Sequence, residues 1–389
     1  MENAFREPVW QAVLRYLEEH GPDTIEELIR LAQIPAPTFA EGRRAGYVEE
    51  RMRSLGLADV RRDGIGNVCG TWEGTQAGEP AILLAAHMDT VFPEETDLTV
   101  KREGTKLTGP GVGDNASNLA GLLAVAEALV RQALRLHRPV IFAATVGEEG
   151  LGDLRGIRHL MEHRRAEVGW VIAVDGGIGG LVHQGVGSRR LRLSCLAQGG
   201  HSWGAFGAPS AIHVLGRIIA EISRLSVPGR PRTTFNVGVI SGGTSVNTIA
   251  PEAQALIDLR SVDGHELQRL EERVRRVVEQ VSASARTRYQ LDVIGDRPTG
   301  SIPATHPLVQ AVRKVHRHLA IETRVVPSST DANIPLHMGV PAVTVGVTAG
   351  GNGHLVDEFI HTGPLVKGLQ QLALLLALGQ DLPRQSTPA

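Results

Sequence analysis

The chain contains four short, mainly apolar runs in which polar and apolar residues do not alternate, at residues 81–86, 140–146, 170–174 and 341–348. Such runs are typical of buried strands in a parallel sheet that is covered on both faces. Segments with helical periodicity, such as 116–134 and 152–163, lie between them. This alternation holds to about residue 180 and resumes near residue 300. It predicts an α/β fold with a mixed, mainly parallel sheet and helices on both faces.

Smaller elements are expected within the first 70 residues. Residues 8–32 are predicted to form one or two helices, with Asp23 as a candidate N-cap. Residues 42–55 should form another helix, closed by Gly56. Residues 60–70 are expected to form a strand.

A different pattern occupies the middle of the chain. Residues 188–197 and 253–260 alternate polar and apolar side chains, as strands with one exposed face do. Together with the helices and strands around them, they predict the order β-α-β-β-α-β, an antiparallel four-stranded sheet on one helical layer. The expected domains are therefore 1–186 for the first part of the catalytic domain, 187–298 for an inserted α+β domain, and 299–389 for the second part.

Each of the four apolar runs leads into side chains that can bind a metal ion. Parallel sheets bind ligands beyond the carboxyl ends of their strands, so these side chains should converge. Histidines with carboxylates suit zinc, with manganese or cobalt as alternatives. The residues that follow the runs are His87, Asp89, Glu148, Glu149, Asp175 and His354. The pattern predicts a metalloenzyme.

Six candidates exceed the ligand set of one four-coordinate zinc, so two metal ions are expected. His87 would bind metal while Asp89, two residues later, holds its other ring nitrogen. Of the adjacent Glu148 and Glu149, one can bind metal while the other acts as general base. Asp114 follows a glycine-rich turn, and taken alone it could simply cap the helix after it.

Composition narrows the function without identifying it. A net charge of −2 and an aromatic content of 4% give no support for a nucleic-acid partner. The longest apolar stretch, 372–378, is too short to span a membrane, and the N-terminus lacks the apolar core of a signal peptide. The two cysteines, Cys69 and Cys195, cannot form a disulfide framework, which favours a reducing compartment. We therefore expect a cytoplasmic enzyme without a membrane partner.

Two other classes of function compete with this interpretation. Residues 200–204 match G-x-S-x-G, and Ser202, Asp331 and His354 follow the chain order of a serine hydrolase. The strand before this motif alternates and the helix after it begins late, so a nucleophile elbow is disfavoured. A non-catalytic metal-binding module is the second alternative, and the complete set of ligands and base argues against it.

The chain resembles the dinuclear zinc exopeptidase and deacylase family, which includes peptidase T, glutamate carboxypeptidase, acetylornithine deacetylase, succinyl-diaminopimelate desuccinylase, aminoacylase and carnosine dipeptidase. The resemblance covers roughly residues 20 to 380. The motifs that carry it are HMDT at 87–90, GPGVGDN at 109–115, VGEEG at 146–150, VDGG at 174–177, GGHS at 199–202, SVNTIAPEAQALIDLRS at 245–261 and GGNGHLVDE at 350–358.

The resemblance implies a role for each candidate residue at the metal centre. One zinc would be bound by His87 and Asp175, and the other by Glu149 and His354. Asp114 would bridge the two ions. Glu148 would be the general base, and Asp89 would orient His87. Many peptidase T-like relatives carry a second aspartate where this chain has Asn115, which weakens that specific assignment. No role is assigned to Thr330 and Asp331.

The inserted domain would act in the family as both a lid and a dimerisation surface. His201 would reach the oxyanion, in many relatives from the partner subunit, and Asn247 and Arg260 would hold a substrate carboxylate. The resemblance thus implies a homodimer through residues 187–298. The expected substrates are di- or tripeptides or N-acyl amino acids, and a deacylase or glutamate-carboxypeptidase-like activity is the alternative to an aminopeptidase.

Overall fold

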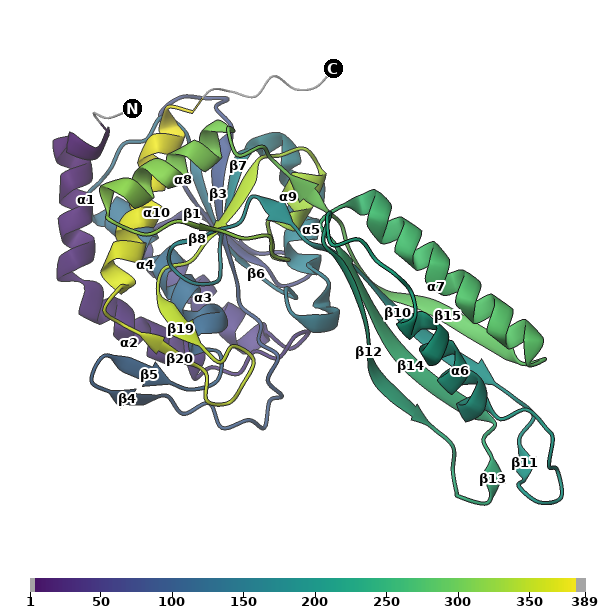
Figure 1. Cartoon of the computed structure of the whole chain (residues 1–389). Coiled ribbons are helices and arrows are strands. Elements are labelled where there is room, and N and C mark those ends of the chain that lie inside the picture. Colours follow the sequence, from purple (N-terminus) through teal and green to yellow (C-terminus); the bar gives the residue numbers. More distant parts are fainter. Residues whose placement is uncertain (1–3, 383–389) are drawn as a thin grey trace. The chain divides into compact units, whose positions relative to one another are not determined.

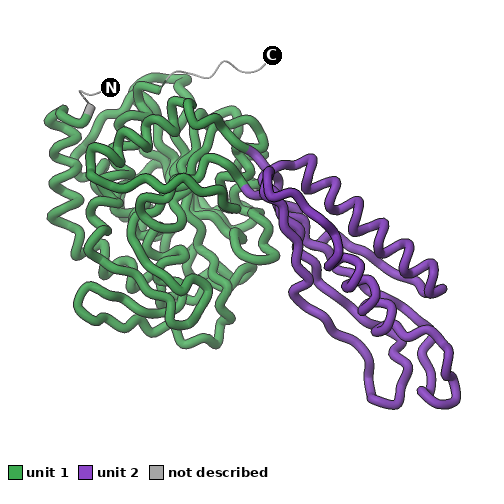
Figure 2. Tube along the Cα trace, in the orientation of Figure 1, with its two compact units in different colours: residues 1–185, 301–389 green, residues 186–300 purple. Residues whose placement is uncertain are grey.

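The computed structural model describes residues 4–382 and divides the chain into two compact units. Unit 1 runs up to Gly185 and resumes at Ser301, whereas unit 2 comprises Val186–Gly300 (Figure 2). The boundaries expected after residues 186 and 298 lie within two residues of these divisions. Each unit has its own sheet and its own buried core.

Unit 1 is built on a six-stranded sheet with the order β1-β2-β6-β3-β7-β18. Its strands are β1 (Ala58–Arg62), β2 (Val68–Trp72), β3 (Ala81–His87), β6 (Val140–Thr145), β7 (Val168–Val174) and β18 (Ala342–Val345). The last four are the predicted apolar runs, and they pair in parallel. β1 and β2 add an antiparallel edge. The predicted mixed, mainly parallel sheet is confirmed.

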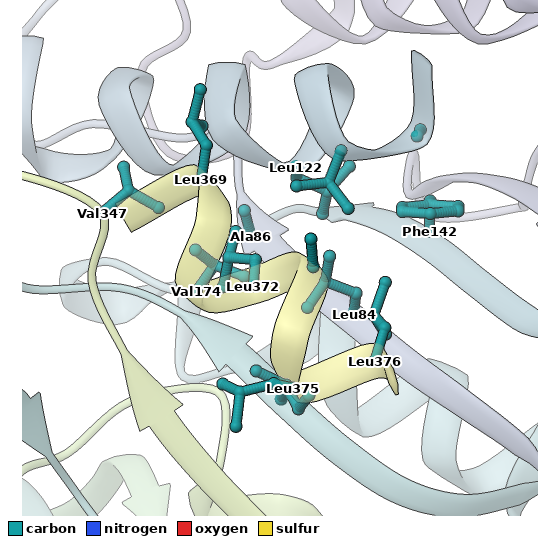
Figure 3. Packing of buried hydrophobic residues seen from close by; sticks show 14 of the residues in the cluster. Leu84, Ala86, Leu122, Phe142, Val174, Val347, Leu369, Leu372, Leu375 and Leu376 are labelled. Carbon is teal, nitrogen blue, oxygen red and sulfur yellow. The ribbon is translucent and has the colours of Figure 1, made fainter. Parts of the chain in front are cut away.

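Alternate side chains of the central strand β3 enter two separate cores. Leu84 and Ala86 belong to a buried cluster with α4 (Asn118–Arg131) and α10 (Leu365–Gln380), part of which is shown in Figure 3. Leu83 and Ala85 belong to a second cluster with α5 (Arg155–Arg164) and α9 (Asn333–His337). Helices therefore cover both faces, which explains why the strand is apolar along its whole length.

The other helices of unit 1 pack around α4 and α10 (Figure 1). They are α1 (Pro8–Glu19), α2 (Gly21–Ala32), α3 (Gly42–Leu55) and α8 (Pro307–His318). The end of α3 at Gly56, which has φ 85°, is confirmed. The N-cap prediction for Asp23 is wrong, because α2 begins two residues earlier with Pro22 in its first turn. The Asp23 carboxylate instead contacts the ring of His20 at 2.7 Å.

The predicted strand over residues 60–70 is interrupted by a turn. Asp63 Oδ1 accepts hydrogen bonds from the backbone amides of Ile65, Gly66 and Asn67, at 2.9 to 3.0 Å. This turn separates β1 from β2 and makes them an antiparallel pair. Asp63 and Gly64, which are typical turn residues, were the local signals for the break.

Short strands complete unit 1. A second four-stranded sheet has the order β19-β20-β5-β4 and consists of β4 (Lys101–Glu103), β5 (Lys106–Thr108), β19 (Ala349–Gly351) and β20 (Phe359–His361). Two further pairs join β8 (Gly180–Leu181) to β17 (Arg324–Val325) and β9 (Gln184–Gly185) to β16 (Gly300–Ser301). The second sheet matters for function because the loop between β19 and β20 carries His354.

Unit 2 has the predicted β-α-β-β-α-β order. Its elements are β10 (Gly187–Leu196), α6 (Ala211–Ser223), β12 (Thr233–Gly242), β14 (Glu252–Ser261), α7 (Gly264–Ser284) and β15 (Arg288–Arg297). The strands form an antiparallel sheet in the order β12-β14-β10-β15. Leu191, Leu193 and Cys195 alternate with polar residues and pack under the two helices. Figure 1 shows the short pair β11 (Gly200–His201) and β13 (Thr248–Ile249) beyond one end of this sheet.

Two observations bear on the environment of the protein. Cys69 and Cys195 are free thiols, and both are buried, in β2 and β10 respectively. Within residues 4–382, no helix combines the length and the hydropathy that crossing a membrane requires.

Candidate metal centre

The candidate ligands of unit 1 gather at the carboxyl ends of three adjacent strands. His87 is the last residue of β3, Glu149 lies just beyond β6, and Asp175 follows β7 directly. Asp114 reaches the same place from the loop ahead of α4, and His354 from the β19–β20 loop. Ligand atoms of His87, Asp114 and Glu149 all lie within 4.8 Å of one another. Because β6, β3 and β7 are neighbours in the sheet, their ends meet at one edge.

Asp114 is at the centre of this cluster. Its Oδ1 lies 3.0 Å from Nε2 of His87, whereas its Oδ2 lies 3.2 Å from Nε2 of His354. The same His354 nitrogen is 3.0 Å from Oε1 of Glu149. The two oxygens of one carboxylate therefore face two different histidines, as a carboxylate shared by two metal ions would.

These spacings fit a metal site. Ligand atoms around a tetrahedral zinc with bonds of about 2.0 Å lie about 3.3 Å apart, close to the separations observed. Asp114 Oδ1 is buried, and within the described part of the chain no donor forms a hydrogen bond with it in spite of its proximity to His87. The donor set of imidazole nitrogens and carboxylate oxygens suits zinc, manganese or cobalt.

The cluster has more negative charge than its histidines can balance. Burial lowers the pKa of His87, but its contacts with Asp114 and Asp89 outweigh this effect and raise the pKa well above its ordinary value. Contacts with Asp114 and Glu149 raise the pKa of His354 to about 10. Burial and the charge of Asp114 raise the pKa of Asp175 to about 7. In the absence of metal, bound protons supply the positive charge that divalent cations would otherwise bring.

Comparison with known proteins identifies the family of this chain. Residues 83–378 match the model of peptidase family M20/M25/M40. The chain belongs to this family. The resemblance inferred from the sequence motifs is thereby confirmed, and membership makes the protein a hydrolase. The matched range begins in unit 1, passes through unit 2 and ends in unit 1.

Individual M20 relatives are distant in sequence and close in fold. An acetylornithine deacetylase of Yersinia pseudotuberculosis is 26% identical over 303 residues, which cover 73% of this chain and 75% of the relative. The structure of a tripeptidase from Staphylococcus aureus has a TM-score of 0.79 at 22% identity, covering 93% of this chain and 99% of that one. A dinuclear metal-binding peptidase of Bacillus subtilis has a TM-score of 0.70 at 16% identity, covering 94% and 100%.

Asp89 has a wider role in the geometry of this M20 site than the orientation of one histidine. Its Oδ1 and Oδ2 accept the backbone amides of Glu148 and Glu149, each at 2.9 Å, and Oδ2 also accepts the hydroxyl of Thr38 at 2.9 Å. The Asp89 backbone carbonyl lies 3.1 Å from Nδ1 of His87, and the carboxylate is farther away, at 3.5 Å. If the neutral His87 ring carries its proton on Nδ1 and donates it to this carbonyl, then Nε2, which faces Asp114, has a free lone pair that can bind metal.

Glu148 and Glu149 are both buried beside each other, at 5% exposure. Asp89 fixes the two consecutive amides, so it also fixes the directions in which the two glutamate side chains leave the backbone. Glu149 contacts His354 and belongs to the ligand cluster. Among the described residues, the group of mutually close ligand atoms consists of His87, Asp114 and Glu149, and it includes neither Glu148 nor Asp175.

The buried side chain of Arg44 binds the backbone at the end of β3. Its guanidinium donates to the carbonyls of Met88 at 2.6 Å and Ile34 at 2.7 Å, and only 1% of the residue is exposed. Burial lowers the pKa of Arg44 to about 10, while the charge of Asp89 acts in the opposite direction. Met88 separates His87 from Asp89, so Arg44 holds the backbone between the two.

Asparagines and a glutamate hold the loop that carries Asp114. Asn115 donates its side-chain amide to the carbonyl of Val174 at 3.0 Å, which ties the loop to the end of β7 next to Asp175. Asn118 donates to the side-chain oxygen of Asn115 at 2.7 Å. An ionised aspartate at position 115 could not donate to Val174, so the Asn115 departure from the Asp-Asp pattern has a structural consequence. On the other side, Glu358 accepts backbone amides of the loop.

Several of these supporting residues were missed in the sequence. Thr38, Arg44 and Asn118 lie in ordinary helical or loop sequence and carry no local signal. Glu358 lies within the GGNGHLVDE stretch that carries the family resemblance, four residues after His354, and that proximity was the available signal.

The candidate residues of unit 2 lie in two places. His201 is on β11 at the tip of the unit, and Ser202 beside it donates its amide to the carbonyl of Asn247 at 3.0 Å. The amide of Trp203 donates to Nδ1 of His201 at 3.2 Å, so the proton of the neutral ring is on Nε2, available to donate. Arg260 is near the other end of β14, opposite Ser188, which follows the unit boundary closely.

The two carboxylate-binding candidates therefore lie far apart within unit 2. β14 extends by about 26 Å between Glu252 and Arg260, at about 3.3 Å per residue. Asn247 precedes this strand at the tip, and Nε of Arg260 is bonded to Asp258 at 2.7 Å. One small substrate cannot reach both residues of the same unit 2.

Proposed function

We propose that this M20 hydrolase cleaves the amide bond of small substrates at a dinuclear metal centre. The observation that carries the proposal is the position of Asp114, whose two oxygens face His87 and His354 separately. His87 and Asp175 would hold one ion, and Glu149 and His354 the other. When bound, the two divalent cations, Zn²⁺ in the first instance and Mn²⁺ or Co²⁺ as alternatives, would polarise the substrate carbonyl and lower the pKa of water.

The residues of the chain would then manage the proton and the substrate. Glu148 would take a proton from the attacking water and later deliver it to the leaving amine. His201, with its proton on Nε2, would donate to the developing oxyanion. Arg260 and Asn247 would bind the polar groups of the substrate, and the guanidinium suits a carboxylate.

The substrate class that we propose is a di- or tripeptide or an N-acyl amino acid with a free carboxylate. The relatives support either choice, since one is named as a tripeptidase and another as an acetylornithine deacetylase. A deacylase or a glutamate-carboxypeptidase-like enzyme is therefore the alternative to an aminopeptidase. The free, buried thiols support a cytoplasmic location.

We further propose that the protein acts as a homodimer through unit 2. The separation of Arg260 from Asn247 supports this, because the tip of one subunit would complete the site of its partner while Arg260 serves its own. The loops at the tip also expose large apolar side chains: Trp203 is 88% exposed and Phe206 92%. Apolar surface of this kind is typical of a region that another protein covers.

Replacement of Glu148 tests the mechanism. Glu148→Ala should keep its metal ions and lose at least about 100-fold in kcat, because a general base contributes about 10²- to 10⁴-fold. Metal content would be measured by atomic emission and activity against a panel of dipeptides, tripeptides and N-acyl amino acids. Full activity in the variant would refute the mechanism.

Chelation separates the enzyme from a non-catalytic metal-binding module. The wild-type protein should lose amide hydrolysis when its metal is chelated and regain it with Zn²⁺, Mn²⁺ or Co²⁺. A metal-loaded wild-type protein that is inert to the whole panel would favour the binding module.

A further inference from the structure

Glu358 is a buried carboxylate whose neighbours are backbone amides. Its Oε1 accepts the amides of Gly113 at 2.9 Å and Asp114 at 2.7 Å, and its Oε2 accepts the amide of Gly111 at 2.9 Å. Only 3% of the residue is exposed, and within residues 4–382 no Lys, Arg or His side chain forms an ion pair with it. The three convergent N–H groups favour the ionised form, but burial and the charge of Asp114 outweigh them and raise the pKa of Glu358 to about 7.

The loop is shaped to receive this carboxylate. A Cβ atom on Gly113 would lie 2.6 Å from Oε1 of Glu358, so a side chain at this position would displace it. Gly111 has φ 70°, a left-handed conformation that glycine adopts without strain. The backbone carbonyl of Glu358 also accepts the amide of Gly109 at 2.8 Å. Glu358 thus contacts the GPGVG segment along its whole length.

The segment that supplies Glu358 also supplies a candidate metal ligand. His354, four residues earlier, contacts Oδ2 of Asp114 through its ring. One short stretch therefore holds Asp114 twice, by its backbone through Glu358 and by its carboxylate through His354. If Glu358 served folding alone, it would not need to connect the segment of His354 to the loop that carries Asp114.

We propose that Glu358 is a positioning residue that presets the Asp114 carboxylate to be shared by two metal ions. The inference rests on the proposed dinuclear centre and extends it. Glu358 contacts neither substrate nor metal. It fixes the backbone of residues 111–114 before metal binds, so the ions do not have to order this loop. Its loss should weaken the binding of both ions, since Asp114 faces the ligands of both.

Calorimetric titration of metal-free protein with Co²⁺ alone tests this proposal. Wild type should bind two ions, and Glu358→Ala should bind them about 10- to 100-fold more weakly, the range found when partners of metal ligands are removed. Glu358→Gln keeps one oxygen for Gly113 and Asp114 but turns an NH₂ group toward Gly111, or the reverse, and should give a smaller loss. If the alanine variant does not fold, the glutamine variant decides.

The control variant removes another carboxylate that accepts a backbone amide, far from the candidate metal centre in the sequence. Asp263 accepts the amide of Glu266 at the start of α7 in unit 2, and Asp263→Ala should lower the melting temperature without changing Co²⁺ affinity. Glu358 variants that melt earlier but bind Co²⁺ as tightly as wild type would show a structural role only and overturn the inference. A wild-type protein that binds no Co²⁺ would instead overturn the proposed function.

Discussion

Asp114 shows how one side chain can organise a site at the scale of the residue. It faces two histidines, and its negative charge changes the titration of both, as well as that of Asp175. The same crowding of carboxylates that is unfavourable in the metal-free protein becomes favourable once divalent cations are present. Protons and metal ions therefore compete for the cluster.

This competition predicts proton release on metal binding. The pKa of His354 is raised to about 10, so this ring carries a proton at pH 7.5 in the metal-free protein, and the contacts of His87 with Asp114 and Asp89 raise its pKa as well. A histidine must lose its ring proton to bind metal, so at least about one proton, from His354, should leave as the ions bind. Metal affinity should therefore increase as the pH rises from 6 to 9, because fewer protons remain to be displaced.

Titrations in buffers with different ionisation enthalpies measure this release. His201→Ala serves as the control, since this histidine is in unit 2 and outside the ligand cluster. The control should release as many protons as wild type. A pH-independent affinity, with no buffer dependence, would contradict the assigned ligand protonation.

The ligand candidates were predictable because each follows an apolar strand or a glycine turn in the sequence. Their supports were not. Glu358 is bonded to an amide 247 positions away, and Asp89 to amides about 60 positions away. Contacts between distant segments leave no periodic signal, so no pattern of neighbouring residues indicates them.

At the scale of the element, strands and helices followed from periodicity, and the errors occurred at their ends. The antiparallel sheet of unit 2 was visible in its alternation, and the parallel strands in their continuous apolar runs. The turn at residues 63–67 was missed although Asp63 and Gly64 were local signals for it, and Asp63 closes it through its own neighbouring amides. The start of α2 was missed because a proline at the first turn of a helix needs no side-chain cap.

Close packing of α10 gives a prediction at this scale. A Cβ atom on Gly368 would lie 1.9 Å from the carbonyl oxygen of Val347, a backbone atom that cannot swing away. Gly368→Ala should therefore cost about 1–3 kcal/mol in the free energy of unfolding, the usual range for overpacking. It should also disturb the segment that leads from Val347 to His354. Urea denaturation followed by circular dichroism measures the cost.

Gly216 provides the matched control. It is also inside a helix, α6, but no atom lies within 4 Å of the Cβ position. Gly216→Ala should stabilise by about 0.5–1 kcal/mol, since alanine loses less conformational entropy in a helix. Equal effects at the two positions would show that helix propensity, and not the contact with Val347, determines the outcome.

At the scale of the whole molecule, the proposed dimer, in which the tip of each unit 2 completes the site of the partner, predicts that two inactive variants complement each other. Glu148→Ala and His201→Ala homodimers should both be nearly inactive. In a mixed dimer, one site would combine an intact Glu148 with the intact tip of the partner, so co-expression should restore up to about half of the activity of a wild-type dimer per heterodimer. Purification with two different affinity tags isolates the mixed species for assay.

The same experiment distinguishes the opposite arrangement. If His201 served the site of its own subunit, each subunit of the mixed dimer would keep one defect, and no activity would return. A monomeric wild-type protein in sedimentation, active at all concentrations, would also rule out the exchange.

The two crossings between the units lie next to each other on unit 1. The amide of Ile302 donates to the carbonyl of His183 at 3.1 Å, and Nδ1 of the His183 ring lies 2.7 Å from the carbonyl oxygen of Ile302. Strand β9 pairs with β16 beside these two residues. A short turn could join these two points, so the 115 residues in between interrupt the chain without separating its ends. In evolutionary terms, unit 2 occupies a position where a whole module can be inserted, exchanged or removed in one genetic event while unit 1 keeps its sheet and its ligands.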